Sequence, residues 1–134
     1  MPRRGHVTKR ELTPDSVYNS KLVTRFINNL MLCGKKSIGS RIFYDAVEMV
    51  AKKRKDDNGL ELFKKVIEVK PDRAVAFAFR WILKHSRARK EKSMADRLCA
   101  EFDDILNNTG ATMKKRDEVH RMADANKAFA HFRV

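Results

Sequence analysis

SKLVTRFINNLMLCGKKSIGSRIFYDAVEMV, residues 20–50, predicts two amphipathic helices joined at a tight corner. Before the corner, the apolar residues recur on one helical face: Leu22, Val23, Phe26, Ile27, Leu30 and Met31. After it, a second stripe consists of Ile38, Ile42, Phe43, Ala46, Val47 and Val50. Gly34 tolerates the left-handed conformation that a helix end often needs, so it is expected to stop the first helix. Lys35 and Lys36 then lie at the corner, either as solvated turn residues or as phosphate contacts.

The chain is strongly basic for its length. Its 134 residues carry 30 Lys and Arg against 17 Asp and Glu, a formal net charge of +13, and the pI is about 10.1. Because such an excess repels itself in a compact fold, it favours a polyanionic partner, most commonly nucleic acid. An anionic membrane is the rival, but it favours one basic helix with exposed apolar residues opposite, whereas this charge is spread over many segments. With 43% apolar residues, residues 1–134 are expected to form a single domain, with nucleic acid as its favoured partner.

The sequence lacks the motifs of enzymes, metal sites and membrane proteins. Cys33 and Cys99 form no CxxC or Cys/His cluster, so we expect structural thiols in a reducing cytosol, with a disulfide between them left open. There is no glycine-rich phosphate loop, nucleophile elbow or HExxH motif. No apolar run reaches the about 18 residues of a membrane span, and the N-terminus lacks the apolar core of a signal peptide. We therefore expect no enzyme activity, cofactor, metal, small-molecule substrate or membrane contact.

An extended basic arm is expected before the helices. Residues 1–18 lack an apolar stripe and carry four early cations: Arg3, Arg4, Lys9 and Arg10. The arm is either an unstructured terminus or a segment that becomes ordered along phosphates. A helical core is expected over 19–130, with a short tail at 131–134. Beyond the helical pair of 20–53, apolar periodicity predicts helices at about 60–68, 72–87, 94–108 and 115–130.

The predicted helix at 72–87 is the most apolar, and we expect it to be central. Its aromatic row with Arg80 favours core packing, with base stacking as the alternative. A dense basic run follows at 84–92, where five of nine residues are Lys or Arg. Ser93 and Asp96 then match a capping box, so Ser93 is expected to cap the next helix; a phosphate contact at that helix start is the alternative.

These residues resemble the small-subunit ribosomal protein seven family in its bacterial form. Ser20 to Ala46, read as Ser-x-Leu-x3-Phe-Ile-x6-Gly-Lys-Lys-x5-Ile-Phe-x2-Ala, is similar to the family signature. Further similarities are the start Met-Pro-Arg-Arg, Pro71-Asp72-Arg73 with Arg80-Trp81, Lys92-Ser93-Met94-Ala95, Lys114-Lys115-Arg116, and Met122 to Arg133. The resemblance covers nearly the whole chain in order.

The resemblance implies an all-α, six-helix protein that binds the ribosomal RNA of the small-subunit head directly and nucleates assembly of that head. Family members lie at the subunit interface, near the exit-site tRNA and the mRNA path and beside small-subunit proteins nine and eleven, in the cytoplasmic ribosome of bacteria. By position, the family's RNA contacts map onto Arg3, Arg4, Lys9, Arg10, Lys35, Lys36, Arg73, Lys92, Ser93, Met94, Arg97, Lys114, Lys115 and Arg116. The basic run at 84–92 adds Lys84, Arg87 and Arg89 as candidates, and the predicted helices add Arg41 and His120.

A prominent feature of the family is missing from the sequence. A long Arg-rich β-hairpin separates the third and fourth helices of the family, but here Glu68 is followed directly by Val69. Either the protein lacks the hairpin, or it has a mobile hairpin whose residues this sequence does not include. We prefer the second explanation. Because the hairpin reaches toward the exit-site tRNA in the family, that contact is the function most affected.

The mechanism expected from the residues is electrostatic. Core helices hold separated cations against the phosphates of a folded RNA junction, and counterion release drives binding. The runner-up is a helical DNA-binding protein with one helix in the major groove, but no polar recognition helix follows a short turn.

Overall fold

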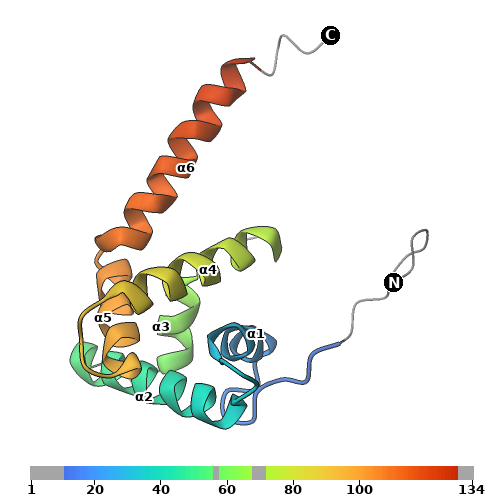
Figure 1. The fold of residues 1–134 in the computed structure, drawn as a ribbon, viewed down its shortest axis with the longest axis vertical. Coiled ribbons are helices and arrows are strands. Elements are labelled where there is room, and N and C mark those ends of the chain that lie inside the picture. The colour runs from blue at the N-terminus through green and yellow to red at the C-terminus, as the bar shows by residue number, and fades with distance from the viewer. Residues whose placement is uncertain (1–10, 56–57, 68–71, 130–134) are drawn as a thin grey trace.

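Six α-helices make up most of the described chain, which comprises residues 11–55, 58–67 and 72–129 of a computed structural model (Figure 1). They are α1 (Lys21–Leu30), α2 (Lys36–Arg54), α3 (Gly59–Val66), α4 (Asp72–Ala88), α5 (Met94–Leu106) and α6 (Gly110–Phe129). No strand occurs in these residues. The predicted all-α, six-helix fold is confirmed.

Five phenylalanines, one from each of α1 to α5, meet at the centre of the core. Phe26 of α1 is fully buried. Its ring centroid lies 5.5 Å from that of Phe43, 5.2 Å from those of Phe63 and Phe79, and 6.0 Å from that of Phe102. Tilted and edge-to-face pairs at these distances add to the free energy of hydrophobic burial. The cluster therefore determines how five helices pack and where their connecting loops lie.

Two helix starts are capped by the side chains that the sequence indicates. Ser93 Oγ accepts a hydrogen bond from the Asp96 amide at 3.1 Å, and the Asp96 carboxylate accepts one from the Ser93 amide at 3.3 Å. Asn58 accepts a hydrogen bond from the Glu61 amide at 3.3 Å at the start of α3. The predicted capping box of α5 is confirmed.

The corner between α1 and α2 differs in detail from the prediction. α1 ends at Leu30, so Gly34 is not the residue that stops it. Gly34 has a φ of +71° and Cys33 one of +52°, and these two residues turn the chain into α2. Lys35 is the N-cap of α2 and Lys36 is its first residue. Gly34 therefore allows the turn that precedes α2, and it does not end α1.

α4 is amphipathic, so the expectation of a central helix holds for only one of its faces. Its inner face contributes Val75, Phe79, Ile82 and Leu83 to the core. On its outer face, Phe77 is 37% exposed and Arg80 and Lys84 are exposed. Among the described helices, those that pack against α4 are α1, α5 and α6, and they cover one side of it. The bundle contains too few helices to surround α4, however apolar its sequence is.

α6 begins at Gly110, before the predicted start at about 115. Gly110 has a φ of +88°, which fits the expected turn, but the helix follows at once. Thr112 and Met113 are buried at the base of α6, where it packs against α4 and α5. Every side chain from His120 to Lys127 is exposed, and Figure 1 shows this half of α6 extending away from the other helices.

Candidate nucleic-acid interface

One groove collects predicted site residues from three segments of the chain, and we call it the corner groove. It has a volume of about 450 Å³ and is lined by Leu30, Met31, Leu32, Lys35, Ile38, Gly39, Ile42, Arg87, Met94 and Arg97. Lys35 comes from the α1–α2 corner, Arg87 from the end of α4, and Arg97 from the start of α5. No acidic residue is among these lining residues. The groove is therefore a concentration of positive charge over an apolar floor.

The two arginines of the corner groove are held in place by backbone carbonyls. Arg87 Nη2 donates a hydrogen bond to the carbonyl oxygen of Leu30 at 3.3 Å. Arg97 Nε donates one to the carbonyl oxygen of Glu91 at 2.7 Å. Because a guanidinium has five N–H donors, each arginine keeps donors for an outside acceptor.

The start of α2 makes the corner groove more favourable for anions. No acidic residue lies in the first turn of α2, and the Lys35 side chain caps none of its amides. The helix dipole therefore favours a negative group at this end, although the Lys36 amide already donates a hydrogen bond to the Gly34 carbonyl oxygen at 2.8 Å. Ile38, which was expected in the buried stripe of α2, is instead 52% exposed in the groove, so that expectation is wrong.

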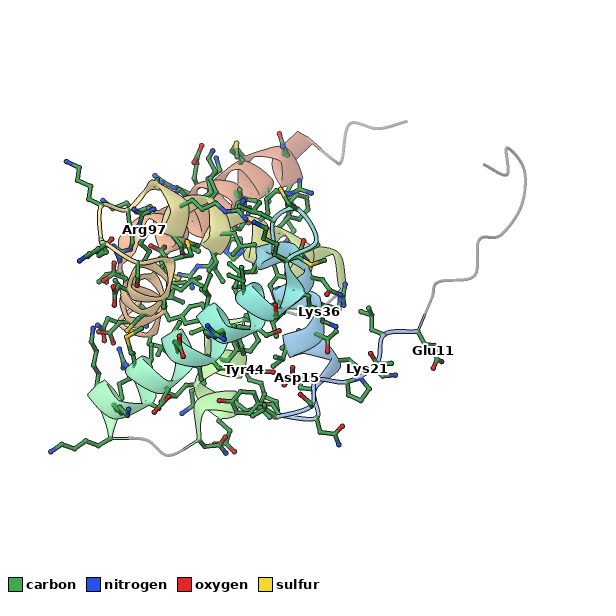
Figure 2. All side chains as sticks on the ribbon, turned by 60° about the horizontal axis from the view of Figure 1, so that its bottom comes forward. Glu11, Asp15, Lys21, Lys36, Tyr44 and Arg97 are labelled. Atoms are coloured by element: carbon green, nitrogen blue, oxygen red, sulfur yellow. The ribbon has the colours of Figure 1, made fainter. Side chains whose placement is uncertain are left out.

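The second half of the predicted arm is attached to the core (Figure 2). The Tyr44 hydroxyl of α2 donates a hydrogen bond to Asp15 at 2.6 Å. Asp15 also accepts from the amides of Val17 and Tyr18 at 3.1 Å each, which shapes a turn. The Tyr18 ring then packs edge-on against Phe43 at 6.5 Å. The Thr24 hydroxyl donates a hydrogen bond to the Thr13 carbonyl oxygen at 2.9 Å. Residues 13–18 thus form a docked segment, which we call the arm clasp.

Lys36 lies on the arm side of the corner. It helps to line a second cavity, of about 300 Å³, with Pro14, Asp15, Ser16, Thr24, Ile27, Ser40 and Tyr44. Figure 2 shows Lys36, Asp15 and Tyr44 on this side and Arg97 at a distance from them. Lys35 and Lys36 therefore line different cavities, one on each side of the corner.

Alkaline pH is expected to weaken the arm clasp. Burial, followed by the hydrogen bond and the charge of Asp15, raises the pKa of Tyr44 from 10.0 to about 12. Because the folded pKa is the higher one, this contribution to stability is fully present below pH 10 and is lost as the pH rises toward 12. Burial also raises the pKa of Tyr18, the other tyrosine. A spectrophotometric titration should show both phenols ionising above pH 10, and Tyr44→Phe should remove the later step.

The Tyr44→Phe variant also provides the check on this assignment. If the titration curve of the variant keeps the later step, the hydroxyl responsible is not that of Tyr44. The variant should unfold at lower urea concentration than the parent at pH 7, because Asp15 loses a charge-assisted hydrogen bond worth about 1.5 kcal/mol.

A second basic groove lies where the end of α4 meets the start of α6, and we call it the terminal-helix groove. It has a volume of about 470 Å³ and is lined by His85, Ala111, Lys114, Lys115, Asp117, Glu118 and Arg121. The sequence indicated Lys114 and Lys115 as RNA contacts, but it did not indicate His85 or Arg121. The spacing of Lys114, Glu118 and Arg121 places them on one helical face and could have identified Arg121. His85 could not be found in this way because it depends on the packing of α4 against α6.

Arg89 is bound by acidic side chains of its own chain. Its guanidinium pairs with Asp104 and lies 3.2 Å from the Glu101 carboxylate and 3.9 Å from that of Glu91. Glu101 is only 2% exposed, and its other oxygen accepts a hydrogen bond from the Thr112 hydroxyl at 2.6 Å. These contacts join the loop after α4 to α5 and the base of α6. Because its charge is shared among three carboxylates, we assign Arg89 a structural role.

The remaining predicted contacts are distributed over the surface. Five of them have exposed side chains: Arg41, Lys84, Lys92, Lys114 and His120. Lys115 pairs with Glu118 and Arg116 with Asp117, each at 2.8 Å. Arg73 lies in the first turn of α4, but its side chain is outside the described part of the structure. The arm cations Arg3, Arg4, Lys9 and Arg10 lie wholly outside the described residues.

The described residues provide no metal site of the usual kind. Within 11–55, 58–67 and 72–129, no group of three or more His, Cys, Asp or Glu is placed to hold a metal ion. None of the helices in these ranges has the length and hydropathy that crossing a bilayer requires. Cys33 is exposed, Cys99 is buried, and both are free thiols, so the disulfide left open by the sequence does not form.

Comparison with known proteins identifies the family. The family model described as ribosomal protein S7p/S5e matches residues 2–68 and 61–127. The chain belongs to the ribosomal protein S7p/S5e family. It is 46% identical to the small ribosomal subunit protein uS7 of Symbiobacterium thermophilum, 48% to that of Dictyoglomus thermophilum and 46% to that of Lacticaseibacillus casei, with 99% of each chain covered. The predicted family and its bacterial type are confirmed.

Membership of the S7p/S5e family gives the function in outline. The chain is a structural, non-enzymatic protein of the small ribosomal subunit, and it binds ribosomal RNA.

The comparison also bears on the missing hairpin of the S7p/S5e family. The alignment with the Symbiobacterium protein spans 155 positions, against 134 residues in this chain, so at least 21 positions have no counterpart here. The two segments that the family model matches meet at 61–68, next to the expected position of the hairpin. The junction at 68–71 lies outside the described residues. A mobile hairpin left out of the sequence, the explanation that we prefer, therefore stays a prediction.

Proposed function

We propose that the corner groove binds the ribosomal RNA of the small-subunit head through its phosphates, with the terminal-helix groove as a second contact. The corner groove carries this proposal because three distant segments deliver Lys35, Arg87 and Arg97 to one place with no acidic lining residue. Elsewhere on α2, by contrast, Lys52 pairs with Glu48 at 2.7 Å. Cations gathered without acidic neighbours favour an outside polyanion, whose released counterions drive binding.

The arrangement of the cations suits a folded RNA junction. The corner groove and the terminal-helix groove are rigidly spaced because α4, which contributes to both, is packed in the core. The arm clasp holds Pro14, Asp15 and Ser16 beside Lys36. Since RNA helices present shape and sugar–phosphate more readily than base edges, fixed spacing of cations can provide specificity.

The family resemblance supports a more specific place in the ribosome. In this proposal the protein acts in the bacterial cytoplasm, nucleates assembly of the head, and lies at the subunit interface near the exit-site tRNA and the mRNA path. Small-subunit proteins nine and eleven are its neighbours. The exposed half of α6, from His120 to Lys127, offers a surface for such contacts. A chain without the hairpin should contact the exit-site tRNA less than its relatives do.

Replacing Lys35 and Lys36 with alanine should weaken binding to head RNA and reduce its salt dependence. Each lysine on a phosphate contributes about one unit to the slope of log K against log salt concentration, so the double variant should flatten that slope by up to about two units. Fluorescence anisotropy with labelled head RNA over a series of salt concentrations measures both quantities.

Lys52→Ala/Lys53→Ala is the matched control, because it removes the same charge from the other end of α2. Its slope should stay close to that of the parent. Equal losses in the two double variants would show that net charge, and not the corner, governs binding. Duplex DNA and unlabelled head RNA can also be compared as competitors at one salt concentration. If duplex DNA competes as effectively as head RNA, the DNA-binding alternative is supported instead.

A further inference from the structure

A small cavity lies among α3, α4, α5 and α6, apart from the two basic grooves. Its volume is about 140 Å³, and apolar side chains such as Ala78 and Ile82 form much of its wall. Trp81, the only tryptophan of the chain, also lines it. Ile82 is buried, whereas Trp81 and Ala78 are half-buried, so the cavity is accessible from the surface on the side of α4.

The Trp81 ring is held by its neighbours on α4. Phe77, one helical turn earlier, stacks on it with a centroid distance of 5.9 Å and an interplanar angle of 30°. The Arg80 guanidinium lies 5.7 Å from the centroid of the Phe77 ring. An aromatic ring whose orientation is fixed in advance loses little conformational freedom when a second ring stacks on it.

Polar and charged groups lie around the same cavity. Lys65 of α3 and Arg116 of α6 line it, and no acidic residue does so, although Arg116 also pairs with Asp117 outside the lining. Asn108, in the loop between α5 and α6, also lines the cavity, and its side chain carries an amide. Such an amide both donates and accepts, and it complements the donor–acceptor edge of adenine.

We propose that this cavity receives an unpaired base of the bound RNA, with adenine preferred. The proposal rests on the RNA-binding function above and adds a contact to a base where the grooves contact phosphates. Single-stranded loops and bulges are recognised by stacking on aromatic rings and by hydrogen bonds to base edges, with cations near the adjoining phosphates. The aromatic wall, the amide and the two cations are that combination. An apolar peptide would leave Lys65, Arg116 and the Asn108 amide without a match.

Trp81 emission provides a direct readout of base binding. The full-length protein is titrated with a short oligoadenylate and with an abasic ribose–phosphate oligomer of the same length and charge. Oligoadenylate should quench the emission and bind roughly tenfold more tightly than the abasic oligomer, as expected for one stacked base. Oligouridylate should bind with an intermediate affinity.

Two variants test whether the base enters this cavity. Ala78→Leu fills the space without a change of charge. Asn108→Gly removes the amide at a position whose φ of +56° glycine adopts without strain. Each should bring oligoadenylate affinity close to that of the abasic oligomer. Asn29→Ala, which removes an exposed amide from α1, is the matched control and should leave it unchanged.

Circular dichroism establishes whether each variant is folded. If Ala78→Leu does not fold, Asn108→Gly alone provides the test. If the parent binds the two oligomers with equal affinity and its emission does not change, the cavity does not bind a base. The salt dependence expected for head-RNA binding through Lys35 and Lys36 would be unaffected by that result. Quenching that survives both variants would overturn the cavity as well, because the base would then stack elsewhere. If neither oligomer nor head RNA binds at low salt, the proposed function fails together with it.

Discussion

Replacing Phe26 with alanine is expected to lower the free energy of unfolding by about 4 kcal/mol. Phe26 is fully buried, and its ring contacts one ring from each of α2, α3, α4 and α5. The cavity left by the ring cannot close easily, because the surrounding rings also support one another; Phe43 and Phe63, for example, lie 4.9 Å apart. Urea denaturation followed by circular dichroism measures the change. Since domains of this size are stable by about 5–15 kcal/mol, the variant should be marginally folded.

Phe77→Ala is the control for ring removal. It deletes the same side chain from the outer face of α4, where the ring is 37% exposed, and it should cost less than about 1.5 kcal/mol. Equal destabilisation by the two variants would show that Phe26 is not the centre of the core. Phe26→Leu keeps most of the volume and should stay folded, so it allows head-RNA binding to be measured. Its affinity should fall, because α1 sets the position of the Lys35 corner.

Replacing Arg89 with methionine is expected to destabilise the fold by about 3 kcal/mol, although Arg89 belongs to the densest basic run of the chain. The substitution leaves Glu101, which is 2% exposed, without its cation. Removing one partner of a buried ion pair typically costs about 3–5 kcal/mol, and the 22% exposure of the Arg89 side chain indicates the lower end. Urea denaturation at pH 7 measures the loss, with Arg41→Met, an exposed arginine of α2, as the neutral control.

A second substitution should rescue part of this loss. Arg89→Met/Glu101→Gln removes the unpaired charge while an amide oxygen can still accept the hydrogen bond of Thr112. The double variant should therefore be more stable than Arg89→Met alone. If Arg89→Met were instead as stable as the parent but bound head RNA weakly, Arg89 would belong to the interface, as the sequence suggested.

The helices could be predicted because their signals are local. Apolar residues at helical spacing placed Phe26, Phe43 and Phe102 on inward faces, and all three are buried. Ser93 and Asp96 are three residues apart, so their capping box could be identified from the sequence and is present. The start of α6 was placed too late because its anchoring is not local: Thr112 is buried where α6 packs against α4 and α5, and it donates a hydrogen bond to Glu101 of α5.

The predicted outer faces were less accurate for a related reason. The apolar sequence of α4 indicated a central helix, but the bundle supplies neighbours on one side and leaves Phe77 exposed. Ile38 fits the helical stripe of α2, yet it lies in the open corner groove. Periodicity identifies which residues share a face of a helix. It does not show how far a neighbouring helix extends along that face.

The sequence by itself determined that this protein is a basic bundle of helices, because helical periodicity, turn chemistry and net charge depend on residue types and short spacings. It also placed Lys35 and Lys36 at the corner between two helices, and their exposure agrees with either a turn or a contact. Only the tertiary structure separated Arg87 from Arg89. The two lie two residues apart in one basic run, yet one lines the corner groove and the other pairs with the buried Glu101. Whether a cation is available to a partner depends on the charges that packing brings near it, and those charges come from residues far away in the sequence.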